Sequence, residues 1–159
     1  MPTFRKRWRK YARKRGLVLA VVDNSVLVSA LINRKGQPAR IVRHLGRCHF
    51  WLVSSSPLLD EFKNVLMRLR TKYAFAQDDV VRVQRLVQTH ASVVQIKGDA
   101  MGCRDRADDM VLETAVRGRA THLITRDDDL KDDPVLRQRM KAVGVEITTV
   151  SRFLKLLEQ

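Results

Sequence analysis

Residues 20–33 read AVVDNSVLVSALIN, and this stretch decides the fold. A short apolar run over residues 17–22 leads directly into Asp23-Asn24-Ser25, and a second apolar run follows at once. A continuous Val- and Leu-rich run of this length is typical of a strand buried on both faces of a parallel sheet. The carboxylate therefore marks the place where a buried strand ends and a helix begins.

Short apolar runs and amphipathic segments alternate along the rest of the chain. This alternation favours a three-layer α/β/α sandwich with a mostly parallel central sheet of about five strands, in one domain over residues 17–159. We expect strands at 17–22, 48–54, 92–96, 121–125 and 145–150, and helices at 25–33, 38–46, 56–69, 78–90, 108–117, 134–144 and 151–158.

The charge balance is strongly basic. The 159 residues include 31 Lys and Arg against 17 Asp and Glu, a net charge of +14, which favours a polyanionic partner. Residues 1–16 form a basic arm with eight Lys or Arg and no acid, and it is either an RNA-binding segment or a solubilising extension. The RNA contacts that we predict in this arm are Arg5, Lys6, Arg7, Trp8, Arg9 and Lys10.

Cysteine usage and hydropathy predict a cytoplasmic protein that does not enter a membrane. Only Cys48 and Cys103 occur, which argues against a disulfide framework. The apolar run before Asp23 is too short for a signal peptide or a membrane span. Cys48-His49 is a weak zinc motif without a second half, and the four histidines show no ligand spacing.

Four acidic side chains fall where chemistry is expected in an α/β fold. Asp23 and Asp127 each follow a predicted strand, and the carboxyl ends of parallel strands share one edge of a sheet. Glu61 and Asp109 recur with apolar residues at helical spacing, so each lies on or beside an inward face. Taken singly, each acid has an ordinary alternative as a helix cap or a solvated side chain.

A cluster of these carboxylates would need a cation. Hard oxygen ligands suit Mg²⁺ or Mn²⁺ rather than zinc. A bound divalent ion would turn an acidic pocket in a basic protein into a site for a phosphodiester, and it would activate water for attack. The sequence shows no arrangement typical of a nucleophilic Ser or Cys triad.

The motifs in order resemble those of PIN domains. VVDNSVLVSALI resembles the opening of that family, SSPLLDEFKNVLMR its second motif, and CRDRADDMVLETAVRGRATHLITRDDDL its third and fourth. The resemblance covers roughly residues 17–157 and is greatest to the PIN-type toxins of prokaryotic toxin–antitoxin pairs.

The resemblance implies a metal-dependent ribonuclease that acts on RNA. It also implies an antitoxin protein as partner and a homodimer. The acidic quartet would be Asp23, Glu61, Asp109 and Asp127, with Asp108 as the alternative to Asp109. The supporting residues would be Asn24, Ser25, Asp105, Asp108, Thr125 and Asp129, and Arg126 would contact the nucleic acid.

Two other classes of function remain open. A non-catalytic module could bind RNA or a protein partner through the basic surface, with the acids acting as helix caps. A different Mg²⁺-dependent phosphotransfer fold is the second alternative, because residues 127–129 contain an Asp-x-Asp pair. A P-loop or Rossmann nucleotide site is excluded, since neither glycine-rich motif occurs.

Overall fold

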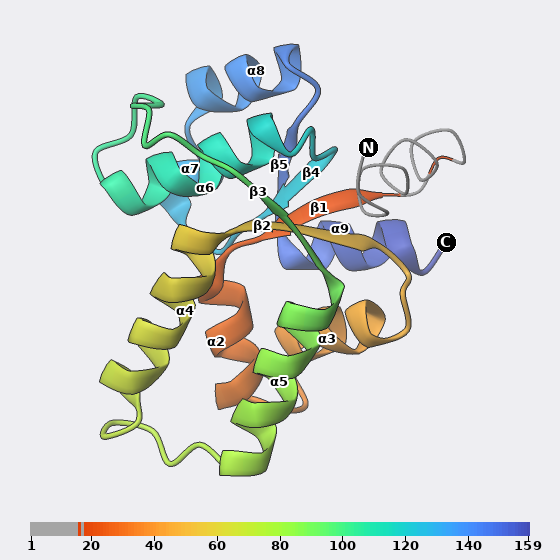
Figure 1. The fold of residues 1–159 in the computed structure, drawn as a ribbon. Coiled ribbons are helices and arrows are strands. Elements are labelled where there is room, and N and C mark those ends of the chain that lie inside the picture. Colours follow the sequence, from red (N-terminus) through yellow and green to blue (C-terminus); the bar gives the residue numbers. More distant parts are fainter. Residues whose placement is uncertain (1–15, 17) are drawn as a thin grey trace, which may run out of the picture.

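A computed structural model of the chain describes Gly16 and residues 18–159 (Figure 1). The predicted RNA contacts of the basic arm, residues 5–10, lie outside the described residues. The described part of the chain contains no helix that is both long and apolar enough to cross a membrane.

The described residues form five strands and eight helices, which alternate as the sequence predicts. The one element that the sequence pattern misses is α7, a single turn directly after Asp127. In chain order the elements are β1 (Leu19–Val22), α2 (Asn24–Ile32), α3 (Gln37–Gly46), β2 (Trp51–Ser55), α4 (Ser56–Leu69), α5 (Gln77–His90), β3 (Ala91–Val94), α6 (Arg106–Arg117), β4 (His122–Ile124), α7 (Asp128–Lys131), α8 (Pro134–Ala142), β5 (Glu146–Thr148) and α9 (Val150–Leu157).

The five strands form one parallel sheet in the order β3-β2-β1-β4-β5, which confirms the predicted fold class. β1 is central, and all four of its residues are buried. Leu19 and Val21 pack into the core on one face, while Ala20 and Val22 pack into the core on the other. A strand with helices on both sides has no solvated face, and this is why its sequence is continuously apolar.

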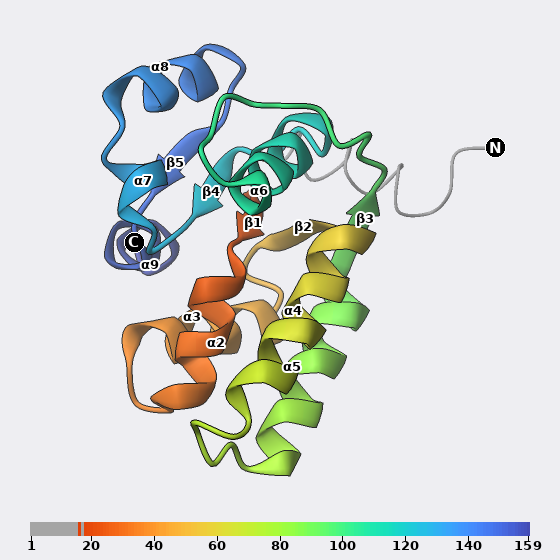
Figure 2. The ribbon, with the colours of Figure 1, turned by 90° about the vertical axis from the view of Figure 1, so that its left-hand side faces the viewer.

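Helices cover both faces of the sheet. α6, α7 and α8 lie on one side, and α2, α3, α5 and α9 lie on the other (Figures 1 and 2). α4 contributes to both cores: Leu58 packs with the α6 side, and Phe62 and Leu66 pack with the α2 side. The molecule is therefore the three-layer sandwich that the alternation predicts.

The carboxyl edge of the sheet collects several chain segments. Since α6 leads back to the start of β4, its first turn lies at this edge, where β1 and β4 also end. β1 and β4 are neighbours, with Val22 paired to Ile124. The condition for bringing Asp23 near Asp127 is thus met by the topology.

The end of α6 packs closely against β2 at Gly118. A Cβ atom at this position would lie 2.2 Å from Cγ1 of Val53 and 2.9 Å from the carbonyl oxygen of Thr114. Both positions are buried, and Val53 is fully enclosed in the core. Only a residue without a Cβ fits between the helix end and the strand.

Gly118→Ala is expected to lower the free energy of unfolding by about 1–3 kcal/mol, because the methyl group overpacks a closed core. Urea denaturation monitored by circular dichroism measures the change. Gly46→Ala is the matched control: its Cβ would meet only side-chain atoms of Leu86, at 3.5 and 3.9 Å, and the change should keep or raise stability. Equal losses in the two variants would contradict the close approach at Gly118.

Candidate active site

Asp23 lies at the end of β1 and is held there by two hydroxyl groups. Thr125 Oγ1 donates a hydrogen bond to Asp23 Oδ2 at 2.7 Å, and Ser25 Oγ donates to the same atom at 3.2 Å. Asp23 occupies the N-cap position of α2, but its carboxylate makes no capping hydrogen bond to the helix. The two hydrogen bonds that hold its carboxylate come from side-chain hydroxyl groups.

Thr125 connects two of the predicted acids. Its side chain is fully buried, and its hydroxyl accepts a hydrogen bond from the backbone N–H of Asp127 at 3.0 Å while donating to Asp23. The Asp127 carboxylate accepts from the backbone N–H of Asp129 at 2.9 Å and so caps α7. One hydroxyl thus fixes the spacing of the ends of β1 and β4.

Asp108 belongs to the same group of carboxylates. Partial burial and the negative charges of Asp127, Asp105, Asp23 and Asp129 together raise its pKa to about 7. Burial likewise raises the pKa of Asp23, against the effect of its hydrogen bonds, and the charge of Asp127 adds to the rise. Mutual repulsion of this kind is what a bound cation relieves.

Asp109 is engaged elsewhere, which favours Asp108 as the third acid. Its Oδ1 accepts hydrogen bonds from the backbone N–H groups of Met101 at 3.0 Å and Cys103 at 2.9 Å, and these bonds lower its pKa. The sequence analysis placed Asp109 on or beside the inward face, and the family resemblance made it one of the four acids expected to hold a cation. The backbone amides of the loop before α6 stabilise its charge instead.

Glu61 also has its contacts away from Asp23. Its Oε1 accepts a hydrogen bond from Arg68 Nη2 at 3.2 Å, and its side chain is about one third exposed. It borders a depression of about 630 Å³ together with Asp109, Lys97 and Arg106. The structure therefore places Asp23 and Asp127 at the ends of β1 and β4. The other two predicted acids, Glu61 and Asp109, lie beside this 630 Å³ depression.

The remaining predicted residues divide between the site and its supports. Asn24 Nδ2 donates to the carbonyl oxygen of Leu58 at 3.1 Å and ties α2 to α4, so of the neighbouring pair Asn24 and Ser25 only Ser25 bonds to the Asp23 carboxylate. Asp105 caps α6 through the backbone N–H of Ala107. Arg126 is exposed beside this edge and donates a hydrogen bond to Ser29 Oγ.

An acidic depression of about 460 Å³ extends from the group. Its lining includes Asp108 and Asp129. Nearby Lys131 is bonded to Asp128 and lies 3.8 Å from Asp132, so it offsets only part of the negative charge. Cys103 also lines the depression, and burial together with Asp109 raises the pKa of its thiol to about 12, which makes it a poor nucleophile.

The sequence analysis missed Glu113, a buried acid of α6 that holds the loop over residues 97–99. Its carboxylate accepts hydrogen bonds from the backbone N–H groups of Lys97, Gly98 and Asp99 at 2.7–2.8 Å, and from Arg117 Nε at 2.6 Å. These bonds lower its pKa to about 2. The i, i+4 pair with Arg117 is the sequence signal that could have found it.

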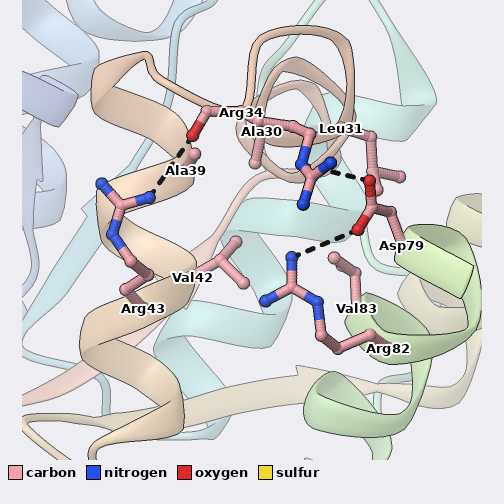
Figure 3. A pocket seen from close by; sticks show the side chains of 9 residues that line it. All are labelled: Ala30, Leu31, Arg34, Ala39, Val42, Arg43, Asp79, Arg82 and Val83. Carbon is pink, nitrogen blue, oxygen red and sulfur yellow. Dashed lines mark hydrogen bonds and ion pairs between the residues drawn. The ribbon is translucent and has the colours of Figure 1, made fainter. Parts of the chain in front are cut away.

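A third depression is basic and lies away from these acids, between α2, α3 and α5 (Figure 3). It has a volume of about 250 Å³. Arg34 Nε and Arg82 Nη2 lie 3.3 and 3.6 Å from the carboxylate oxygens of Asp79, whereas Arg43 of α3 donates a hydrogen bond to the carbonyl oxygen of Arg34 at 3.3 Å (Figure 3). Arg34 and Arg82 neutralise the single carboxylate, and Arg43 adds a further positive charge to the lining, so this pocket is not a metal centre.

The donor set at the carboxyl edge suits a hard divalent cation, although it is not arranged as a closed ligand shell. Among the residues that the structure describes, no group of three or more His, Cys, Asp or Glu side chains is placed to hold a metal ion. The donors of Asp23, Asp108 and Asp127 are carboxylate oxygens, which Mg²⁺ and Mn²⁺ prefer, and these ions keep several waters. Their chemistry fits such an ion better than it fits zinc.

The fold and the site define a parallel α/β protein with a cluster of carboxylates at the carboxyl edge of the sheet, which is where such folds bind their ligands. The chain belongs to the PIN-domain family: the family model described as PIN domain matches residues 19–129. That match begins with β1 and ends in α7, so it includes all four predicted acids. PIN domains are generally nucleases. A comparison with curated proteins gives no match.

Replacing Asp108 by Asn is expected to stabilise the metal-free protein at pH 8. The pKa of Asp108 is raised from 3.8 to about 7 in the folded protein, so the folded state binds more protons than the unfolded state between these values. Stability from this group therefore falls as the pH rises from about 4 to about 7. Thermal unfolding in EDTA measures the gain, which should disappear near pH 4.

The matched control is Asp60→Asn, at an exposed position in α4. This change should give no comparable pH-dependent gain. A lower melting temperature for Asp108→Asn than for the wild type at pH 8 would show that the carboxylates around Asp108 do not repel it.

Proposed function

We propose that the chain is a metal-dependent endoribonuclease that hydrolyses RNA phosphodiester bonds with Mg²⁺ or Mn²⁺. The observation that carries the proposal is the convergence of Asp23, Asp108 and Asp127, from three separate segments, at one edge of the sheet in a protein of net charge +14. An acidic cluster in a basic protein is expected where a cation mediates contact with a polyanion.

When bound, the ion would polarise the scissile phosphate and lower the pKa of the attacking water. Asp23, Asp108 and Asp127 would hold it through their oxygens. Thr125 and Ser25 keep the Asp23 carboxylate directed at the edge by donating to Oδ2. No side chain of the protein has to form a covalent bond to the substrate.

Arg126 is the described residue best placed to contact the RNA backbone. It lies between Asp127 and the buried Thr125, it is exposed, and its guanidinium group donates a hydrogen bond to Ser29 Oγ. A guanidinium fork binds phosphate oxygens through two parallel hydrogen bonds. The basic arm at residues 1–16 would add further phosphate contacts and base stacking.

The set of four acids that the resemblance implies differs from the proposed set at one residue. Asp108 replaces Asp109, because the Asp109 carboxylate is already bonded to two backbone amides. Glu61 remains the proposed fourth acid on the strength of its motif, and its ion pair with Arg68 has to open for it to take part.

The proposed biological role is that of a toxin in a prokaryotic toxin–antitoxin pair, acting in the cytoplasm. Its support is the order and spacing of the four motifs, which resemble those of PIN-type toxins. An antitoxin protein and a second copy of the chain are the partners proposed on the same basis.

A non-catalytic RNA-binding module is the second candidate. One observation favours it: within the described residues the acids do not form a complete ligand group. In that case divalent ions would leave thermal stability unchanged, and the acids would serve as the helix caps that Asp105 and Asp127 already are.

Asp23→Asn is expected to abolish RNA cleavage with little loss of stability, because Asn keeps the shape of the side chain but removes its charge from the ion. The assay uses purified protein and a mixed single-stranded RNA pool with Mn²⁺, Mg²⁺ or EDTA. EDTA should stop wild-type cleavage as completely as the substitution does.

The control variant is Asp60→Asn, at an exposed position on α4, which should cleave at the wild-type rate. Unchanged cleavage by Asp23→Asn would contradict the assignment. Absence of cleavage in all samples, with no thermal shift on adding metal, would support the binding module instead.

The choice between the two neighbouring acids gives a separate prediction. Asp108→Asn should lower the cleavage rate by about 100-fold or more, because it removes a proposed ligand. Asp109→Asn should keep most of the activity, since the Asn carbonyl can still accept from Met101 and Cys103. The same RNA assay, run with both variants at saturating Mn²⁺, compares them. The opposite order of activities would restore Asp109 as the third acid.

A further inference from the structure

The turn that closes α3 brings two histidines together at the amino edge of the sheet, opposite the acids. The N–H of His49 donates to the carbonyl oxygen of His44, and the N–H of Cys48 donates to that of Leu45, both at 3.0 Å. Cys48 has a φ of 58°. These bonds and this left-handed residue define a Schellman-type helix end, in which the first and last residues of the motif lie side by side.

The two imidazole rings face each other through the same atom. Nδ1 of His44 lies 2.7 Å from Nδ1 of His49, and the ring centroids are 5.0 Å apart. The His44 side chain is mostly buried, whereas His49 is exposed, so the pair is open to solvent on one side.

Glu158 determines which nitrogen of His44 carries a proton. Nε2 of His44 lies 3.1 Å from Glu158 Oε1, which also accepts from Arg40. These hydrogen bonds lower the pKa of Glu158, so it is an ionised acceptor and His44 donates from Nε2. The lone pair of a neutral His44 is then on Nδ1 and points at His49.

We propose that His44 and His49 bind one Zn²⁺ ion through their Nδ1 atoms, with water molecules as the remaining ligands. Imidazole nitrogen is a preferred ligand for Zn²⁺. A carboxylate that accepts from the other ring nitrogen is the usual support of a metal-bound histidine. Since no third protein ligand stands with the pair among the described residues, water occupies the other positions.

The pair needs little movement to admit the ion. With Zn–N bonds of about 2.0–2.1 Å, tetrahedral coordination separates two ligand nitrogens by roughly 3.4 Å, so a small rotation of the exposed His49 is enough. Without the ion, the 2.7 Å contact is a hydrogen bond that His49 Nδ1 donates to His44 Nδ1, so binding requires the His49 proton to move from Nδ1 to Nε2. The strain at Cys48, where glycine is usual, accompanies the turn that holds the rings together.

The test is the thermal shift of the full chain with Zn²⁺ in the presence of excess Mg²⁺, which occupies the carboxylates of the proposed active site. Zn²⁺ should raise the melting temperature of the wild type by about 3 °C or more at a concentration far above its dissociation constant. The shift should be lost in His49→Gln and in His44→Gln. His90→Gln is the matched control, because the Nδ1 of His90 is bonded to the carbonyl oxygen of Leu86.

Imidazole nitrogen chemical shifts, measured by NMR, give a second readout that does not depend on stability. Zn²⁺ should shift Nδ1 of His44 and His49 and leave His90 unchanged. No Zn²⁺ shift in the wild type, or a shift that His49→Gln keeps, would overturn the proposal. Because His49→Gln should keep Mg²⁺-dependent RNA cleavage, failure of this site is distinguishable from failure of the proposed ribonuclease.

Discussion

The hydrogen bond from Thr125 to Asp23 is the contact on which the site depends. It spans the ends of two adjacent parallel strands that are about 100 residues apart in sequence. The same hydroxyl accepts from the backbone of Asp127, so a single buried group sets the positions of two acids. The parallel pairing of β1 and β4 makes this contact available, and the buried core on both faces of β1 fixes the pairing.

The carboxylates at this edge repel one another, and their charge is opposite to the net charge of the chain. Five carboxylates, Asp23, Asp105, Asp108, Asp127 and Asp129, influence one another at the edge of the sheet, and the rest of the chain is strongly positive. This repulsion does not stabilise the folded state, because like charges raise the pKa of Asp108 and disfavour its ionised form. The crowding is explained if a divalent cation neutralises the cluster and the positive surface holds the polyanion. Membership of the PIN-domain family agrees with this account at the level of a nuclease.

Much of the fold and part of the site could be predicted from sequence because they depend on local pattern. Asp23 and Asp127 each follow a short apolar run, and the end of a strand is visible in hydropathy alone. The choice between Asp108 and Asp109 was not accessible in this way. Helical spacing identified Asp109 as inward-facing. Its carboxylate accepts hydrogen bonds from the backbone amides of Met101 and Cys103, and no sequence pattern predicts where these loop residues lie.

The pairing of His44 and His49 was missed for a related reason. A spacing of five residues is not a helical neighbour relation, and the rings meet only because Cys48 adopts a left-handed conformation at the helix end. Glu113 was missed because three of its four partners are backbone groups of another loop. In each case the deciding partner is a backbone conformation rather than a residue type.

The central claim is that Asp23, Asp108 and Asp127 hold a divalent cation. The most direct measurement is a crystal structure grown with Mn²⁺ and recorded near the manganese absorption edge. The account predicts one or more anomalous difference peaks within bonding distance of these three carboxylates, with Asp109 still bonded to its loop. A structure without such a peak, or with the ion on Asp109 and away from Asp108, would contradict it.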